Sequence, residues 1–350
     1  MGFEFRKFKD IDLNDSFFDS LKSDYAEFSK WFEKKSENEA LIHFDKYGNL
    51  NGFLYLKIED EELDIDPPQS KARRLKVGTM KIDAHGTRLG ERFIKKIFDS
   101  ALSHNVDEIY VTVFDKHEAL IDLFTKYNFI KIGLKHSDNG SENVLSRKMK
   151  GKNIISEYPF IKYENNNIYF LSIYPEYHSR LFPDSILKTE DNDIVKDISH
   201  TNSIHKIYIA GMRGMEKLKN GDILIIYRTA EKGTSARYSA VFSSVCVVEE
   251  LKYLDEFHTY ESFYEYCKKY SIFTESELKT IYKEKKYKYV IKMTYNIALT
   301  KRIVRARLIE MGIMSDDRTF YNGFGRLDFG QLINVFRESH SNESIIIDKT

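Results

Sequence analysis

Hydrophobic and polar positions follow two different periods along the first seventy residues, and each period predicts a different element. Residues 3–8, FEFRKF, alternate apolar and polar side chains and predict an edge strand, whereas residues 12–36 space their apolar positions as one or two helices do. Two apolar runs on either side of Tyr47-Gly48-Asn49 predict a β-hairpin. The acidic, proline-containing segment EDEELDIDPPQSKA, residues 59–72, predicts a loop.

From residue 73 onward the pattern alternates between strands and helices. It predicts strands over 73–83, 108–114, 129–134 and 143–149, and helices over 88–104 and 117–127. This order predicts a mixed sheet with helices on both faces, forming a first domain over residues 1–151. The chain has 350 residues, a length that is typical of two domains.

The remaining residues, 152–350, predict a second domain that is rich in strands, so that the whole chain belongs to the α+β class. Helices are expected at 178–187, 260–270, 275–284, 301–310 and 328–337. Strands are expected at 205–211, 221–229, 238–251 and 288–299, with a further strand in NNNIYFLSI.

Net charge, cysteine content and the lengths of the apolar runs limit the kinds of partner and site that we expect for this chain. The formal net charge is zero, from 54 basic and 54 acidic residues, so any nucleic acid would have to bind a local patch. The two cysteines, Cys246 and Cys267, are too few for a disulfide framework or a zinc site, and we expect buried thiols and no metal. The chain lacks an apolar run of membrane-spanning length and an apolar secretory core at its N-terminus. We therefore expect a cytoplasmic protein without membrane contact.

The stretch AHGTRLGERF, residues 84–93, lies between a predicted strand and a predicted helix. Backbone N–H groups at such a helix start bind phosphate without needing a side chain. Gly86 and Gly90 would give an anion room to approach, and Arg88 either adds a charged donor or points away. Together with the strand EIYVTVF and the helix HEALIDLFTKYNF, this stretch resembles the GNAT superfamily of acyl-CoA-dependent N-acetyltransferases over residues 3–150.

The resemblance implies acetyl-CoA as cosubstrate. His85 takes the position of the family's Gln or Arg, Arg88 that of its first Gly and Gly90 that of its last. The implied contacts are the end of the preceding strand, through its backbone, and the loop with the helix start: Met80, Lys81, Ile82, His85, Gly86, Thr87, Arg88, Leu89, Gly90 and Glu91.

The resemblance leaves the proton-transfer residue open. Many family members place a Tyr before a Gly-Phe pair, but here the stretch FTKYNF has Phe124 in that position, and Phe cannot donate a proton. Asn128 replaces the Gly and tolerates the same left-handed backbone. The remaining candidates are a bound water or one of Tyr110, Asp83, His85 and His117. His117 also takes a position where the family often has an Asn that contacts the cofactor, or is simply a solvated residue at the helix start.

The second half resembles the PUA-like β-barrel group through LSIYPEYHSRLF, LKNGDILIIYRT and YSAVFSSVCVVEEL, over residues 167–300. This resemblance implies a cleft that binds RNA or modified bases, with Tyr or Phe stacking since no Trp lies in this half. Each candidate contact is equally consistent with a solvated charged surface; the candidates are His178, Arg180, Arg213, Arg228, and Arg302 with Arg305 on one helical face.

These patterns favour an N-acetyltransferase that acetylates an amine on a nucleic-acid-associated acceptor. That acceptor could be an RNA base, an RNA-bound protein or an aminoacyl-tRNA, the target of some bacterial GNAT toxins. The alternative is a non-enzymatic RNA-binding or regulatory protein whose first domain only binds acyl-CoA, which the absence of a proton donor at Phe124 favours. The acceptor and the oligomeric state stay open.

Overall fold

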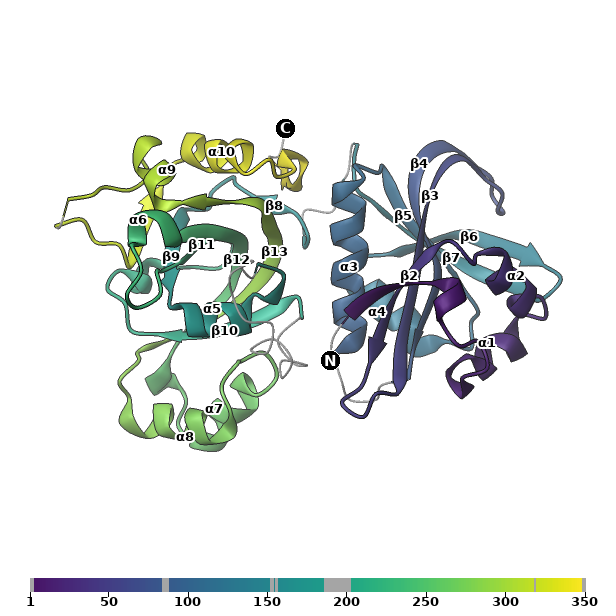
Figure 1. Ribbon diagram of the computed structural model, residues 1–350, viewed down its shortest axis with the longest axis horizontal. Coiled ribbons are helices and arrows are strands. Elements are labelled where there is room, and N and C mark those ends of the chain that lie inside the picture. The colour runs from purple at the N-terminus through teal and green to yellow at the C-terminus, as the bar shows by residue number, and fades with distance from the viewer. Residues whose placement is uncertain are drawn as a thin grey trace. The chain divides into compact units, whose positions relative to one another are not determined.

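The computed structural model describes residues 3–83, 88–151, 154, 157–185, 203–317 and 319–347. The chain divides into two compact units, Met1–Ile155 (unit 1) and Ser156–Thr350 (unit 2), and Figure 1 shows both, coloured along the chain. The predicted boundary lay at residue 151. The predicted cofactor contacts His85, Gly86 and Thr87 lie outside the described residues.

Unit 1 is built on a seven-stranded mixed sheet of order β1-β2-β3-β4-β5-β7-β6. Its neighbouring strands are antiparallel except for β4 and β5, which run parallel. The strands are β1 (Phe3–Lys7), β2 (Glu39–Phe44), β3 (Leu50–Leu63), β4 (Gln69–Ile82), β5 (Glu108–Val113), β6 (Ile130–Ser137) and β7 (Gly140–Lys148).

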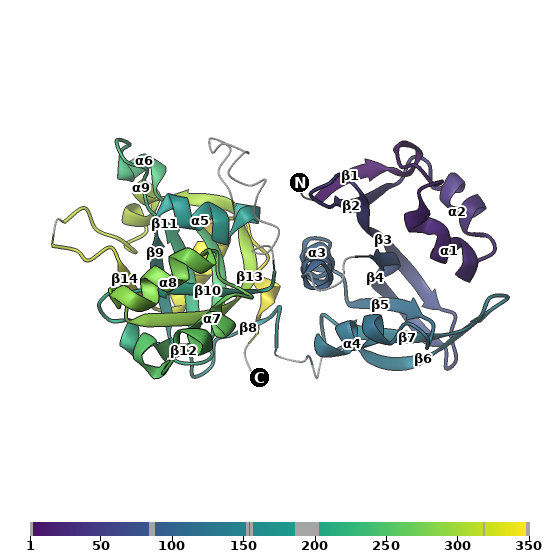
Figure 2. The ribbon, with the colours of Figure 1, turned by 90° about the horizontal axis from the view of Figure 1, so that it is seen from below.

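Helices cover both faces of this sheet, as Figure 2 shows. On one face lie α1 (Asp19–Asp24) and α2 (Phe28–Lys34), and on the other lie α3 (Leu89–Ser103) and α4 (Glu118–Lys126). The first pair buries an aromatic cluster against β2 and β3, which includes Phe18, Phe32 and Phe53. On the opposite face a Cβ at Gly52 would lie 2.9 Å from Leu89 Cδ2, so the glycine lets α3 lie close against β3.

The predicted acidic loop over residues 59–72 is wrong for most of its length. Strand β3 continues to Leu63 and β4 begins at Gln69, so only five residues connect the two strands. The extension is held by the buried Arg74, which donates to Glu108 Oε2 of β5 and to the backbone carbonyls of Glu61 on β3 and Ser70 on β4. An arginine that bonds both strands and a carboxylate stabilises a strand pair that has little apolar character of its own.

Unit 2 is built on a six-stranded sheet of order β10-β13-β12-β11-β9-β14, with a separate two-stranded pair of β8 and β15. The strands are β8 (Ile161–Lys162), β9 (Ile168–Ile173), β10 (His205–Ala210), β11 (Ile223–Arg228), β12 (Val241–Tyr253), β13 (Tyr289–Val304), β14 (Phe324–Leu327) and β15 (Ile346–Ile347). The helices are α5 (Pro175–Leu181), α6 (Ala236–Ser239), α7 (Tyr260–Cys267), α8 (Glu275–Glu284), α9 (Arg305–Glu310) and α10 (Phe329–Glu338).

The sheet of unit 2 is curved but open. All six of its strands contribute side chains to one hydrophobic cluster, including Tyr208 of β10 and Phe324 of β14 at its two ends, which requires curvature. Among the described residues no backbone pairing joins β10 to β14. The predicted closed PUA-like barrel is therefore not shown.

The predicted helix over residues 301–310 begins later than expected. Strand β13 continues to Val304 because Ile303 and Val304 pair with Phe242 and Val241 of β12, and α9 starts at Arg305. Arg302 and Arg305 consequently do not share a helical face. No helix in the described part of the chain has both the length and the apolar character needed to cross a membrane.

Candidate functional site

Strands β4 and β5 pair over only part of their length. Their parallel register runs from Arg74 opposite Glu108 to Val77 opposite Val111, although β4 continues to Ile82. The other edge of β4 stays paired with β3 as far as Ile82. The edge of β4 that faces β5 is thus free of strand partners after Val77 within the described residues. Such an edge can pair with an extended ligand through backbone hydrogen bonds.

A β-bulge at Gly78 marks the point where the two strands separate. Tyr55 pairs with Thr79 and Leu56 with Val77, which leaves Gly78 without an opposite residue. A Cβ at Gly78 would lie 2.8 Å from Tyr55 Cδ1, and the Tyr55 ring is buried. Because a bulge bends the strand that carries it, Gly78 accounts for the divergence of β4 from β5.

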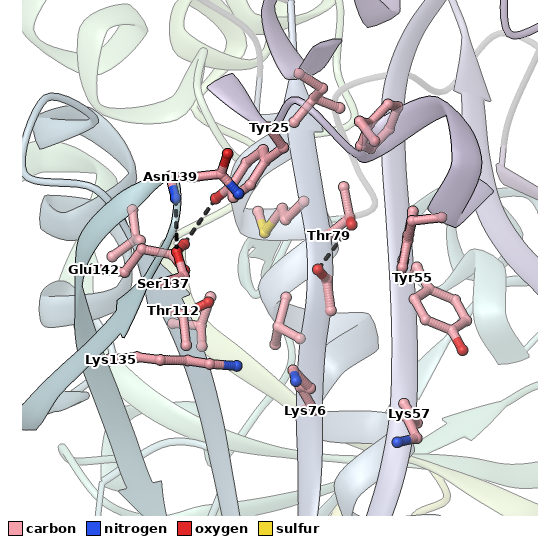
Figure 3. A pocket seen from close by; sticks show the side chains of 18 of the residues that line it. Tyr25, Tyr55, Lys57, Lys76, Thr79, Thr112, Lys135, Ser137, Asn139 and Glu142 are labelled. Atoms are coloured by element: carbon pink, nitrogen blue, oxygen red, sulfur yellow. Dashed lines mark hydrogen bonds between the residues drawn. The ribbon is translucent and has the colours of Figure 1, made fainter. Parts of the chain in front are cut away.

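A cavity of about 330 Å³ opens over this divergence. Its floor comes from β4 and β5, and its walls come from the α1–α2 segment, the start of α4 and the β6–β7 hairpin, as the close-up in Figure 3 shows in part. The volume is within the range of small-molecule sites. Lining residues that carry polar or aromatic groups are Tyr25, Glu27, Trp31, Tyr55, Lys57, Glu59, Lys76, Thr79, Thr112, His117, Lys135, Ser137, Asn139 and Glu142.

Tyr25 and Glu142 form a hydrogen-bonded pair in the wall of the cavity. The Tyr25 hydroxyl donates to Glu142 Oε1 at 2.7 Å (Figure 3). Burial, and then the hydrogen bond and the charge of Glu142, raise the pKa of Tyr25. The phenol is therefore a neutral donor at physiological pH, and it fixes the orientation of a carboxylate that is only 5% exposed.

A second pair in the wall is formed by His117 and Asp24. His117 precedes the first residue of α4, and its Nε2 lies 3.0 Å from Asp24 Oδ2. The His117 side chain is 40% exposed, so it remains accessible from the cavity. A carboxylate that orients an accessible imidazole is a common arrangement for proton transfer.

The opposite end of the cavity gathers lysines around one carboxylate. Glu59 accepts a hydrogen bond from the Tyr110 hydroxyl and lies 2.9 Å from Lys57 Nζ and 3.6 Å from Lys76 Nζ. Burial raises the pKa of Glu59, but this hydrogen bond and the two lysines outweigh the burial and lower it. Burial lowers the pKa of Lys76, with a further contribution from the charge of Lys135.

The three residues predicted for proton transfer have different surroundings, and only one of them lines the cavity. His117 lines the cavity. Tyr110 is buried, with 1% exposed, and reaches the cavity only through Glu59. Asp83 follows the end of β4, is exposed, and lies 3.5 Å from Lys81 Nζ. Sequence reasoning missed Glu142 and took Tyr25 for part of an apolar helix face.

The predicted cofactor contacts on β4 have different surroundings. Met80 lines the cavity. The ammonium of Lys81 donates to Ser20 Oγ at 2.6 Å and to the carbonyl of Phe17, so its side chain lies on the α1 face. Ile82 ends the strand, next to the start of α3.

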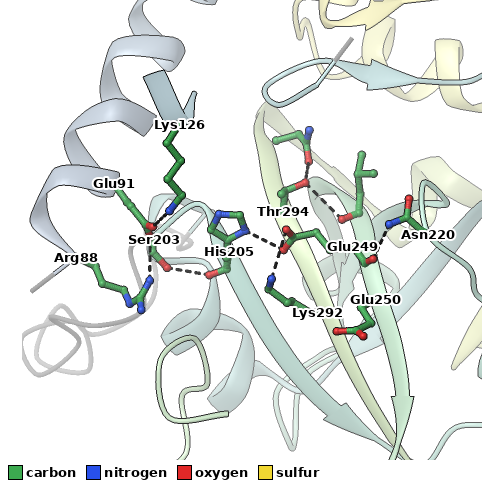
Figure 4. A network of polar contacts seen from close by, with 12 residues as sticks. Arg88, Glu91, Lys126, Ser203, His205, Asn220, Glu249, Glu250, Lys292 and Thr294 are labelled. Carbon is green, nitrogen blue, oxygen red and sulfur yellow. Dashed lines mark hydrogen bonds and ion pairs between the residues drawn. The ribbon is translucent and has the colours of Figure 1, made fainter. Parts of the chain in front are cut away.

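The predicted contacts on α3 are held within unit 1. Arg88 Nη1 donates to Glu91 Oε2 at 3.1 Å, and Lys126 Nζ donates to Glu91 Oε1 at 2.7 Å (Figure 4). Leu89 is buried. A Cβ at Gly90 would lie 2.9 Å from Leu123 Cδ2, so this glycine allows α3 and α4 to approach each other. The side chain of Arg88 is thus bound by Glu91.

Phe124 cannot take part in proton transfer, because its side chain has no ionisable group and is buried. Its side chain is fully buried in α4, and its ring centroid lies 4.9 Å from that of Phe129. Asn128 has a φ of 61°, the left-handed backbone that its place in the sequence requires. Phe124 therefore supplies no group that could transfer a proton.

Most of the charged residues singled out in unit 2 have internal partners. His178 is fully buried with Nε2 2.7 Å from Ser243 Oγ, and burial lowers its pKa to about 3. Arg228 is buried and donates to Glu231 at 2.7 Å. Arg305 donates to Asn322 Oδ1 at 2.6 Å.

Two further arginines of unit 2 that were predicted to contact RNA also donate to groups within the unit. Arg180 donates to the carbonyl of Ile272 and Arg302 donates to that of Leu299. Arg213 lines a cavity of about 680 Å³ together with aromatic side chains that include Tyr169 and Phe320. Figure 4 also shows His205 bound to Glu249, which in turn lies 3.6 Å from Lys292. RNA binding by unit 2 stays a prediction.

No protein-family model and no curated protein matches the chain. Among solved structures, a GNAT superfamily phosphinothricin acetyltransferase from Sinorhizobium meliloti in complex with acetyl-CoA is 13% identical, with a TM-score of 0.28, covering 42% of this chain and 89% of its own. A GNAT-family acetyltransferase from Streptococcus pneumoniae is 13% identical, with a TM-score of 0.30, covering 42% and 98%. The NatC complex bound to Gag peptide and CoA has 14% identity, a TM-score of 0.30, and covers 43% and 100%. At these identities and TM-scores we rest the functional proposal on the geometry of unit 1.

Proposed function

We propose that unit 1 is an acyl-CoA-dependent N-acetyltransferase and that transfer takes place in the cavity over the diverging strands β4 and β5. The observation that carries the proposal is the divergence itself. A parallel pair that ends at Val77 and Val111 leaves the edge of β4 free beside a cavity of about 330 Å³. An extended thioester arm needs such an edge, and an amine needs such a cavity next to it.

The residues of the chain fit acetyl-CoA at two places. The backbone of Gly78–Ile82 offers hydrogen-bonding groups on its unpaired side to the amide-containing arm. The first turn of the 15-residue helix α3 follows β4 and offers backbone N–H groups to the pyrophosphate. Backbone groups, rather than side chains, would bind the cofactor at the predicted contacts Met80, Ile82 and Arg88 to Glu91.

The cavity contains groups suited to the proton transfers of the reaction. Glu142 takes a proton from the acceptor's ammonium, and the resulting amine attacks the thioester carbonyl. The carbon–sulfur bond breaks as the new carbon–nitrogen bond forms, and the sulfur takes the second proton that the nitrogen releases. Tyr25, a neutral phenol because its pKa is raised, donates to Glu142 and orients it for the first proton transfer. His117, oriented by Asp24, is the second candidate for the same step.

The alternative is a protein that binds acyl-CoA without transferring the acetyl group. The buried Phe124, at the position of the family's usual Tyr, favours it. The predicted association of the acceptor with nucleic acid would need contacts from unit 2, where most of the candidate side chains are bonded internally.

Two measurements distinguish an acetyltransferase from a protein that only binds acyl-CoA. Isothermal titration of the full chain with acetyl-CoA should give heat and a thermal shift; the absence of both would exclude transferase and sensor alike. Release of free CoA in the presence of a panel of amines is then followed with a thiol reagent. Amine-dependent release supports the transferase, whereas binding without release to any amine supports the sensor.

A further inference from the structure

The cavity of unit 1 is polarised, with its lysines gathered at one end. Lys57 and Lys76 stand directly opposite each other in the β3–β4 register. Directly opposite residues of an antiparallel pair point to the same face of a sheet, here the face of the cavity. Lys135 enters from β6, and Figure 3 shows it extending toward Lys76.

Negative charge at this end does not balance these lysines. Glu59 pairs with Lys57 and Lys76, but no carboxylate lies within 4.0 Å of the Lys135 ammonium among the described residues. Glu142 stands opposite Lys135 in the β6–β7 register, yet its carboxylate is turned to Tyr25 (Figure 3). Glu59 is shared by Lys57 and Lys76, and the charge of Glu61 also acts on Lys57, so Lys135 adds a positive charge that has no carboxylate of its own nearby in the described residues.

This positive charge is held where water screens it only in part. The Lys76 side chain is 24% exposed and that of Glu59 is 9% exposed. Burial lowers the pKa of Lys76, the charge of Glu59 raises it, and the charges of Lys135 and Lys57 lower it, so that the net shift is downward. An anionic group placed between Lys76 and Lys135 would relieve this repulsion and gain charge-assisted hydrogen bonds.

The distance from this cationic end to the free edge of β4 limits the size of the ligand. Lys76 precedes Thr79 by three residues, which corresponds to about 10 Å along an extended strand. Since lysine side chains reach several ångströms, an amine beside Thr79 and an anion at the lysines would lie roughly 5–10 Å apart. Both groups therefore fit on one small molecule in this cavity.

We infer that the acceptor is a small amine that also carries a carboxylate or a phosphate, bound through that anion by Lys57, Lys76 and Lys135. This inference rests on the proposed acetyl transfer. It gives the two ends of the cavity different tasks: the lysines hold the anion, while the wall formed by Tyr25 and Glu142 receives the amine.

The test compares matched acceptors on the full chain, with CoA release as the readout. The ω-amino acids with two to six methylene groups are compared with their uncharged amides, and aminoalkyl phosphates with the corresponding amino alcohols. We expect the acidic member to have at least a tenfold higher kcat/KM, with an optimum at intermediate length. The carboxylate and phosphate series show which anion is preferred. Equal rates for acidic and neutral partners would overturn the inference.

A matched pair of variants tests the lysines. Lys135→Gln should raise KM for the acidic acceptor about tenfold and leave the rate with its neutral amide unchanged. Lys131→Gln on the same strand, at an exposed position outside the cavity, should change neither. Loss of the acidic preference in both variants, or in neither, contradicts the assignment.

Binding of products separates failure of this inference from failure of the proposed function. If no amine is acetylated, the N-acetylated ω-amino acids and their amides are titrated into the full chain by calorimetry. Selective binding of the acids that Lys135→Gln abolishes would support the anion site even without turnover, and its absence would overturn it. Failure of the proposed function is recognised separately, by the absence of heat with acetyl-CoA.

Discussion

Each unit contains a tyrosine that donates to a glutamate, and the two pairs have the same geometry. Tyr25 donates to Glu142 in unit 1 and Tyr266 donates to Glu250 in unit 2, both at 2.7 Å. In both cases burial first, and then the glutamate, raises the pKa of the phenol. A perturbed tyrosine is therefore not in itself a sign of a functional site.

The surroundings distinguish the two pairs. The Tyr25 pair lines a cavity beside the free edge of β4. The Tyr266 ring packs 5.3 Å from the ring of Phe257 and has the ammonium of Lys252 5.2 Å above it, which is a structural role in the packing of α7. Access to a cavity and to an unpaired strand edge, rather than the pKa, identifies the candidate site.

The largest expected effect comes from removing the carboxylate in the cavity. Glu142→Gln takes away the proposed base while preserving its shape, and general-base removal costs about 100-fold or more in rate. We expect that loss in kcat for CoA release. Glu250→Gln in unit 2 is the matched control and should stay within twofold of wild type. Similar losses in both variants would mean that the effect is structural.

A smaller effect is expected from the tyrosines. Tyr25→Phe should lower kcat about tenfold, because Glu142 loses the donor that orients it. Tyr266→Phe should leave kcat unchanged. Both variants lose a hydrogen bond to a charged group, worth about 1.5–3 kcal/mol of unfolding free energy, so denaturant titration should show comparable destabilisation. A Tyr25→Phe enzyme with full kcat would remove Tyr25 from the mechanism.

Two histidines extend the comparison to pH. Above pH 6.5 the buried His178 is neutral in both the folded and the unfolded chain. Its pKa is lowered from 6.5 to about 3, so as the pH falls between those values only the unfolded chain gains the proton, and stability is lost. His178→Gln should therefore reduce the acid-side slope of unfolding free energy by about 1.4 kcal/mol per pH unit.

His117→Gln should act on the rate. Its side chain lies in the cavity wall and is held by Asp24, so we expect about a threefold to fivefold loss of kcat. Denaturant titrations from pH 7 to pH 4, together with CoA-release assays, measure both quantities. A slope that is the same in wild type and His178→Gln would contradict the buried, neutral state of His178.

Local pattern predicted most of the elements that frame the site, but not the contacts that make it. The helices α3 and α4 and the strands β5 and β7 lie within a few residues of their predicted bounds, because each has a clear apolar period. The end of the β3–β4 hairpin was missed, because it is held by the bonds of Arg74 to Glu108 of β5 and to carbonyls of both strands, which no local pattern indicates.

The pairing of Tyr25 with Glu142 joins residues 117 positions apart, and nothing in either local stretch indicates it. The bulge at Gly78 depends likewise on the register with β3. Tyr25 and Glu142 therefore became candidates only through the tertiary structure, whereas His117 was predicted from the sequence. The acetyl-CoA prediction rested on residues 84–93 and the elements on either side of them.

Hydrogen–deuterium exchange of the full chain, with and without acetyl-CoA, tests the central claim most directly. Binding along the free edge of β4 should protect amides within residues 78–82, and those at the start of α3, while β11 and β12 of unit 2 exchange as before. Protection confined to unit 2, or no protection anywhere at saturating acetyl-CoA, would contradict the assignment of the cofactor to the divergence of β4 and β5.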